Sequence, residues 1–142
     1  MVYMSEVLRR NRRQSGLDFV DNAADLEATT RKFCKNNSIV PKSYTFYGGT
    51  DLYHLSREVH SGVVRGNSIY PTNKEEARIR RKYLLEAYAA LRDMISLVSS
   101  MDDSIGFKEE VYQEWSRLLY NENNLIKNVL ESDKKRYQNL PE

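Results

Sequence analysis

The sequence has little cysteine, proline or glycine, and each shortage excludes a class of protein. The single cysteine, Cys34, excludes an internal disulfide and fits a reducing cytoplasm. Six glycines and three prolines in 142 residues are too few for the many turns of a sandwich or barrel. No apolar run approaches the roughly 20 residues that cross a bilayer, and the N-terminus lacks the apolar stretch of a signal peptide. We therefore expect a cytoplasmic protein with no membrane segment.

Charge is abundant but unevenly distributed. The composition, 40% hydrophobic and 30% charged, is typical of one globular domain with exposed helix faces. The N-terminus carries a surplus of three positive charges, because Arg9, Arg10, Arg12 and Arg13 face only Glu6, and the rest of the chain has a net charge of −1. Such a basic arm commonly binds nucleic acid or an acidic partner.

Helical periodicity predicts four segments. They span about residues 15–35, 43–67, 73 to a break at 99–106, and 107–132. Because short loops join them, we expect an all-α fold, an antiparallel up-down-up-down four-helix bundle. The predicted bundle covers residues 15–135, between a flexible basic arm (1–14) and a frayed tail (136–142).

Each segment carries one apolar stripe, which predicts the core. The stripes comprise Leu17, Val20, Ala24, Leu26, Thr30, Phe33 and Cys34; Tyr44, Tyr47, Leu52, Leu55, Val59 and Val63; Ala77, Leu84, Tyr88, Leu91, Ile95 and Val98; and Phe107, Val111, Trp115, Leu118, Leu125 and Val129. Gly48 and Gly49 weaken the second helix and indicate a kink or a close helix approach within it. Glu122 lies near the fourth stripe, so its carboxylate must be paired or at the edge of the core.

The stretch "GNSIYPTNKEEARIRR" predicts a corner between the second and third helices. Pro71 disfavours helix at Tyr70. Thr72 with Glu75, or Asn73 with Glu76, forms a capping box, so the third helix should begin near Asn73.

Catalytic and metal-binding patterns are weak. A di-iron bundle needs Glu-x-x-His on two helices. This chain offers only Asp51-x-x-His54, and its one other histidine, His60, belongs to another helix face. Cys34 lies on an apolar stripe and has no neighbouring base to activate it. We therefore expect a protein that is not an enzyme, with no metal, no cofactor and no small-molecule substrate.

Basic clusters and tyrosines are the most suggestive chemistry. The basic residues with the strongest claim to phosphate or a partner are Arg65, Arg78, Arg81 and Lys82 around the corner and Lys134, Lys135 and Arg136 near the C-terminus. A solvated helix surface laced by pairs such as Glu75 with Arg78 is the alternative. Five tyrosines lie off or beside the stripes and can stack bases or fill subunit interfaces, of which we favour interfaces: Tyr53, Tyr70, Tyr83, Tyr112 and Tyr120.

Several stretches together resemble a known family. They are "QSGLDFVDNAADLEATTRKFC", "VPKSYTF", "GNSIYPTNKEEARIRRKYLLEAYAAL", "EVYQEWSRLL" and "SDKKRY". With the basic N-terminus, they resemble accessory variability determinants, the four-helix-bundle proteins found beside reverse transcriptases in diversity-generating retroelements. That family is similar to the proteins encoded in intervening sequences of bacterial ribosomal RNA genes.

The resemblance implies a function that periodicity does not give. It implies a ring-like homopentamer without catalytic activity, which binds the reverse transcriptase and template RNA and supports cDNA synthesis for mutagenic homing. The contacts it implies are the basic arm, Arg78, Arg81 and Lys82 at the corner, and Lys134, Lys135 and Arg136 in the tail. The rival interpretation is a structural or protein-interaction bundle with no nucleic-acid role.

Overall fold

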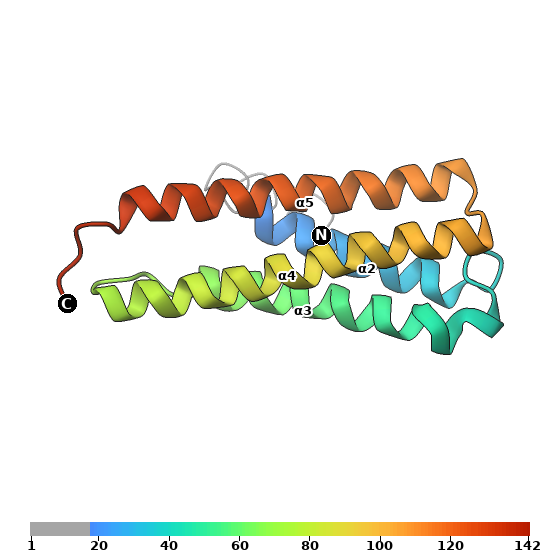
Figure 1. The fold of residues 1–142 in the computed structure, drawn as a ribbon, viewed down its shortest axis with the longest axis horizontal. Helices are drawn as coiled ribbons and strands as arrows, with labels where there is room; N and C mark the ends of the chain where they lie inside the picture. The colour runs from blue at the N-terminus through green and yellow to red at the C-terminus, as the bar shows by residue number, and fades with distance from the viewer. Residues whose placement is uncertain (1–17) are drawn as a thin grey trace, which may run out of the picture.

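A computed structural model describes residues 18–142, and this part of the chain is all-helical. Its four α-helices are α2 (Asp18–Lys35), α3 (Thr50–Asn67), α4 (Lys74–Ile105) and α5 (Glu109–Arg136). They lie side by side along one long axis, with their connections at the two ends (Figure 1). Each helix packs on two neighbours: α2 on α3 and α5, and α4 on α3 and α5. The expected all-α class is thus confirmed, and none of these helices is long and apolar enough to cross a membrane.

Trp115 lies at the centre of the core that joins the helices. Its ring is fully buried and meets Phe33 of α2 edge-on, with centroids 5.3 Å apart. Its indole N–H donates to the Thr30 hydroxyl at 3.0 Å, which satisfies the one polar group of the side chain. Leu84 and Leu91 of the α4 stripe are also fully buried. The predicted stripes therefore identify about half of the buried apolar residues, and they miss large ones such as Met94, Leu119 and Ile126.

The corner before α4 is capped almost as predicted. The side chain of Asn73 accepts a hydrogen bond from the Glu76 N–H at 2.8 Å. The Glu76 carboxylate reaches back to Thr72, accepting from its hydroxyl at 2.6 Å and its N–H at 2.8 Å. These hydrogen bonds lower the pKa of the Glu76 carboxyl, and the bond from the Thr72 hydroxyl has the largest effect. The pairing of Asn73 with Glu76 is thus the one the chain uses, and Glu75 takes no part in the cap.

The predicted second helix is wrong at its start. Instead of a continuous helix from residue 43, a 3₁₀ turn (Lys42–Tyr44) and a π-helical turn (Thr45–Gly49) precede α3. Tyr47, predicted to be in the core, is 80% exposed. Gly48 explains the local geometry, because a Cβ there would overlap the side chain of buried Met101 in α4. The two glycines therefore mark both a break in the α-helix and a close approach.

The last two helices are longer than predicted. α4 continues through the predicted break to Ile105, because Val98 and Met101 extend its buried stripe. It stops at Gly106, whose φ of 75° is the left-handed conformation that glycine favours. α5 continues beyond residue 132 to Arg136 and buries Asp133.

Glu122 was predicted to be paired or at the edge of the core, and the structure meets the first alternative in part. The side chain is fully buried rather than at the core edge. One carboxylate oxygen accepts from the Asn22 amide at 3.1 Å, and the other has no hydrogen-bond partner within the described part of the chain. Burial raises the pKa of this carboxyl to about 8, although the bond from Asn22 acts in the opposite direction.

Candidate functional site: a basic end of the bundle

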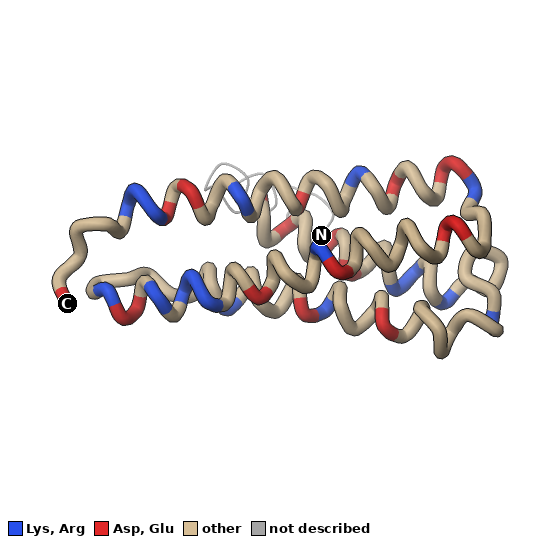
Figure 2. The backbone as a smooth tube through the Cα atoms, in the orientation of Figure 1, with Lys and Arg blue, Asp and Glu red and all other residues tan. Residues whose placement is uncertain are grey.

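The predicted corner and tail cations lie at the same end of the molecule. Arg78, Arg81 and Lys82 lie near the start of α4, and Lys134, Lys135 and Arg136 form the end of α5. Figure 2 shows Lys and Arg gathered where α4 begins and α5 ends. Residues 74–82 and 133–142 together carry eight Lys and Arg against four Asp and Glu. Segments more than 50 residues apart therefore form one surface, which we call the basic end.

A groove runs between the two helices at the basic end. Its volume is about 360 Å³. The lining residues are Lys74, Ala77, Arg78 and Arg81 of α4, Asp133 and Lys134 of α5, and Tyr137 and Gln138 after it. The groove thus combines three predicted cations, Arg78, Arg81 and Lys134, with an aromatic ring.

Some of these cations are neutralised by carboxylates and others are not. Arg78 pairs with Glu75 at 2.7 Å and Lys74 with Glu142 at 3.0 Å, and all four side chains are substantially exposed. Such surface pairs contribute little free energy and exchange readily with another anion. In the described part of the chain, Arg81 and Lys134 have no carboxylate within ion-pair distance. The predicted ion pair between Arg78 and Glu75 is therefore present, but the basic end keeps more positive than negative charge.

Arg80 was not among the predicted site residues, yet it organises the basic end. Its side chain is only 7% exposed and binds Asp133 through two hydrogen bonds, of 2.7 and 3.2 Å. It also donates to the backbone carbonyls of Gly66 and Ile69, each at 3.1 Å. One guanidinium thus joins the end of α3, the corner, α4 and α5. Its position four residues before Leu84 placed it on the α4 stripe, which is the signal that could have identified it.

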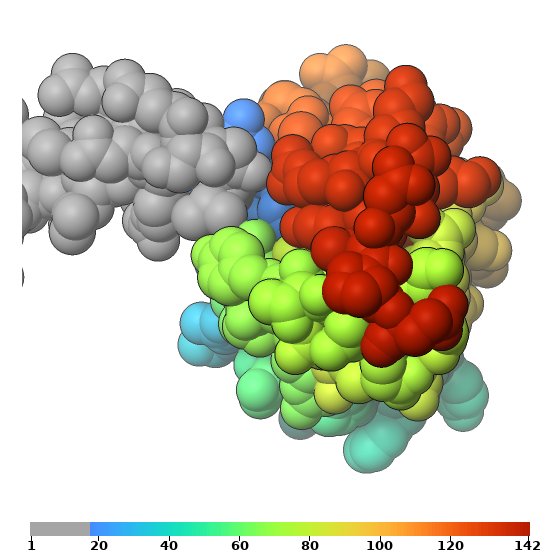
Figure 3. Space-filling model, turned by 90° about the vertical axis from the view of Figure 1, so that its left-hand side faces the viewer, coloured from blue at the N-terminus to red at the C-terminus, as the bar shows by residue number. Residues whose placement is uncertain are grey.

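The C-terminal residues pack across the basic end. We expected residues 136–142 to form a frayed tail. Instead, the Lys74 N–H donates to the Pro141 carbonyl at 2.9 Å, and Tyr137 lies against Arg80, with 5.8 Å from the guanidinium carbon to the ring centroid. Figure 3 views this end and shows the last residues covering part of the α4 start. The segment after α5 therefore forms one wall of the groove.

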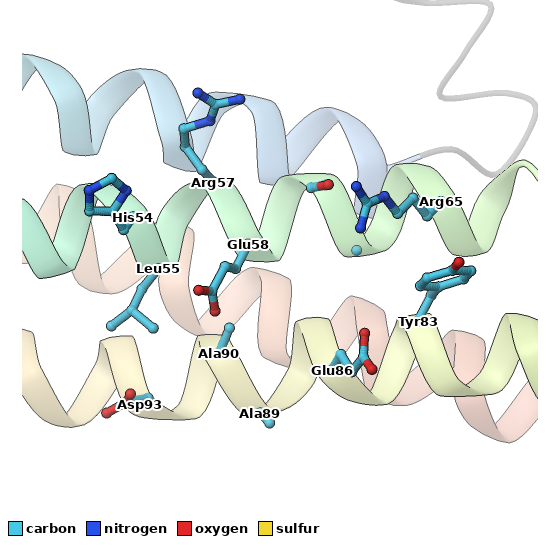
Figure 4. Close-up of a pocket in the computed structure, with 12 residues that line it drawn as sticks. His54, Leu55, Arg57, Glu58, Arg65, Tyr83, Glu86, Ala89, Ala90 and Asp93 are labelled. Atoms are coloured by element: carbon cyan, nitrogen blue, oxygen red, sulfur yellow. The ribbon is translucent and has the colours of Figure 1, made fainter.

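Lys82, Lys135 and Arg136 do not line this groove, and Arg65 lies on a different one. The Arg65 guanidinium lies 6.0 Å from the centre of the Tyr83 ring, on a larger groove between α3 and α4 (Figure 4). Three acidic side chains, Glu58, Glu86 and Asp93, also line that groove of about 740 Å³. Its mixed charge makes it a poor match for a polyanion.

The remaining predicted residues give little for chemistry. Arg9, Arg10, Arg12 and Arg13 lie outside the described residues. In the described part of the chain, no group of three or more His, Cys, Asp or Glu could hold a metal ion. His60 bonds Glu27 at 2.7 Å instead. Burial raises the pKa of the Cys34 thiol to about 11, so the thiol stays protonated near neutral pH and is a poor nucleophile.

The predicted tyrosines differ in how far their side chains are exposed. Tyr70 and Tyr120 are 77% and 53% exposed, whereas Tyr53 and Tyr83 are partly buried beneath Arg31 and Arg65. Tyr137, which lines the groove, was not among the predicted site residues, although this tyrosine directly follows "SDKKR".

Comparison with known proteins assigns no family. No protein-family model, curated protein or solved structure matches the chain. The observations that bear on function are therefore the geometry of the basic end and the sequence resemblance.

Proposed function

We propose that this chain is a non-catalytic accessory protein that binds a reverse transcriptase and its template RNA or cDNA. In this proposal it supports cDNA synthesis in the mutagenic homing of a diversity-generating retroelement, in the cytoplasm. The observation that carries the nucleic-acid part is the meeting of Arg78, Arg81 and Lys134 around one groove. The reverse transcriptase part rests on the sequence resemblance.

The physical basis of binding is electrostatic. An arginine side chain can bond two phosphate oxygens through its planar fork, and among residues 18–142 no carboxylate lies within ion-pair distance of Arg81. Phosphates that displace salt ions from a cationic surface gain free energy from the released ions, so affinity falls steeply as salt rises.

The proposed assembly multiplies this surface. We propose an antiparallel up-down-up-down bundle that forms a homo-oligomer, a pentamer by resemblance. Each copy contributes one basic end, so several weak contacts to one strand act together. A ring of such ends gives a polymerase and its template a common platform.

Charge reversal tests the nucleic-acid part. In the full chain, Arg81→Glu with Lys134→Glu should weaken binding of a labelled RNA by about tenfold or more and flatten its dependence on salt. The matched control is Lys35→Glu with Lys108→Glu, at the opposite end of the bundle, which should bind like the wild type. Fluorescence anisotropy between 50 and 300 mM salt measures both effects.

Co-purification tests the partner. The wild-type protein should co-purify with the reverse transcriptase encoded beside it. An outcome with no RNA binding at low salt and no such partner favours the structural bundle. The ion pairs Arg78–Glu75 and Lys74–Glu142 favour that second candidate, because they show that part of the charge laces the surface.

A further inference from the structure

Tyr137 separates two hollows at the basic end. It lines the groove of about 360 Å³ and also a neighbouring cavity of about 410 Å³. The guanidinium carbons of Arg80 and Arg136 lie 5.8 and 5.9 Å from the centre of its ring. Both arginines line the neighbouring cavity and neither lines the groove. The lining of the groove therefore includes the ring but neither of the arginines that contact it.

The rest of the groove matches an anion attached to a flat apolar group. Arg78, Arg81 and Lys134 supply positive charge, and Ala77 supplies a small apolar surface. The one carboxylate that lines the groove, Asp133, has both oxygens engaged by Arg80. Its charge is therefore compensated within the protein and does not oppose an incoming phosphate.

We propose that the groove binds one nucleotide of a single-stranded nucleic acid, with the base stacked on Tyr137 and the phosphates on Arg78, Arg81 and Lys134. This inference rests on the proposed function and specifies the nucleic acid at its basic end. The volume of the groove, about 360 Å³, lies in the range of about 300–1,000 Å³ that is usual for ligand sites.

The ring decides between a single strand and a duplex. In a duplex each base is stacked on its neighbours, and only the phosphates and groove edges are available to a protein. A single strand can turn a base out against an aromatic side chain, whatever the base. Cations alone would serve either form, so a contribution from Tyr137 requires the single strand.

The test compares variants of Tyr137 in the full chain. The probe is a fluorescent single-stranded oligonucleotide of about 12 nucleotides, with the matching duplex as a second probe. Tyr137→Leu should weaken single-strand binding about 5- to 150-fold, and Tyr137→Phe should leave it unchanged. Tyr120→Leu, at an exposed tyrosine on α5, is the control and should bind like the wild type. Duplex binding should be weaker and insensitive to all three substitutions.

A second measurement needs no substitution. Adding a dinucleotide to the wild-type protein should shift the Tyr137 ring proton resonances upfield, as stacking requires. Unmoved resonances, equal binding by Tyr137→Leu and wild type, or duplex bound as tightly as single strand would each overturn the proposal. So would an acidic peptide that binds as tightly as the oligonucleotide and loses affinity equally in Tyr137→Leu.

The outcomes separate this inference from the proposed function. If RNA binding depends on Arg81 and Lys134 but not on Tyr137, the stacking site is wrong and the proposed function stands. If the folded protein binds no nucleic acid at low salt, both are wrong.

Discussion

Arg80→Ala should lower the free energy of unfolding by about 3–5 kcal/mol, the cost of breaking a buried ion pair by removing one partner. The substitution leaves Asp133, whose side chain is 10% exposed, without its cation. It also removes one hydrogen-bond donor to each of the carbonyls of Gly66 and Ile69. Urea unfolding followed by circular dichroism measures the change.

Arg78→Ala is the matched control two residues away. Its guanidinium pairs with Glu75, but both side chains are 67% exposed, so the loss should stay below about 1 kcal/mol. Arg80→Met with Asp133→Leu should recover much of the stability, because it leaves no unpaired charge in the interior. A loss in Arg80→Ala as small as that in Arg78→Ala would show that this pair does not hold the basic end together.

Glu122→Gln should stabilise the protein by about 3 kcal/mol at pH 7 and change little near pH 4. Burial raises the pKa of the Glu122 carboxyl from its ordinary 4.5 to about 8. Between these values the folded protein keeps the proton and the unfolded chain loses it. Stability therefore falls as pH rises through this window, by about 1.4 kcal/mol per pH unit, and the loss is complete above pH 8.

The glutamine variant removes this pH dependence while keeping the acceptor for the Asn22 amide. Free energies of unfolding measured between pH 4 and 8.5 should diverge as pH rises. Glu114→Gln, at an exposed position of the same helix, should follow the wild-type curve throughout. Wild-type and Glu122→Gln curves that run parallel across this range would mean that the buried carboxyl is already ionised at pH 7.

The sequence predicted the parts of the fold that follow from periodicity and capping. Leu84, Leu91 and Trp115 are buried because residues three or four apart share a helix face, whatever lies around them. Asn73 caps α4 because the cap depends only on residues within one turn. Such local rules hold wherever the backbone is a regular helix.

The error at the start of the second helix arose where the backbone departs from a regular α-helix. Successive side chains of an α-helix are rotated by about 100°. The π-helical turn at Thr45–Gly49 has more residues per turn, so a stripe drawn with the α-helical step does not hold there. Tyr47 is exposed, whereas Leu52, five residues later, is buried. The packing of Gly48 against Met101, a contact between distant segments, is not readable from the sequence around either residue.

The candidate site was predictable in its cations and not in its architecture. Charge counting identified Arg78, Arg81 and Lys134, but only the fold brings them to one groove. Charge counting could not show that Arg80 is buried on the Asp133 carboxylate. Tyr137 becomes a candidate binding residue only in the folded structure, where it lines two cavities.

The most direct test of the central claim, that nucleic acid binds at the basic end, is a lysine acetylation footprint of the full chain with and without RNA. We expect RNA to protect four lysines at the basic end, Lys74, Lys82, Lys134 and Lys135, at low salt and to lose that protection at high salt. Lysines at the opposite end, Lys35, Lys42 and Lys108, should react equally in both samples. Protection spread evenly over both ends, or none at the basic end, would contradict the account.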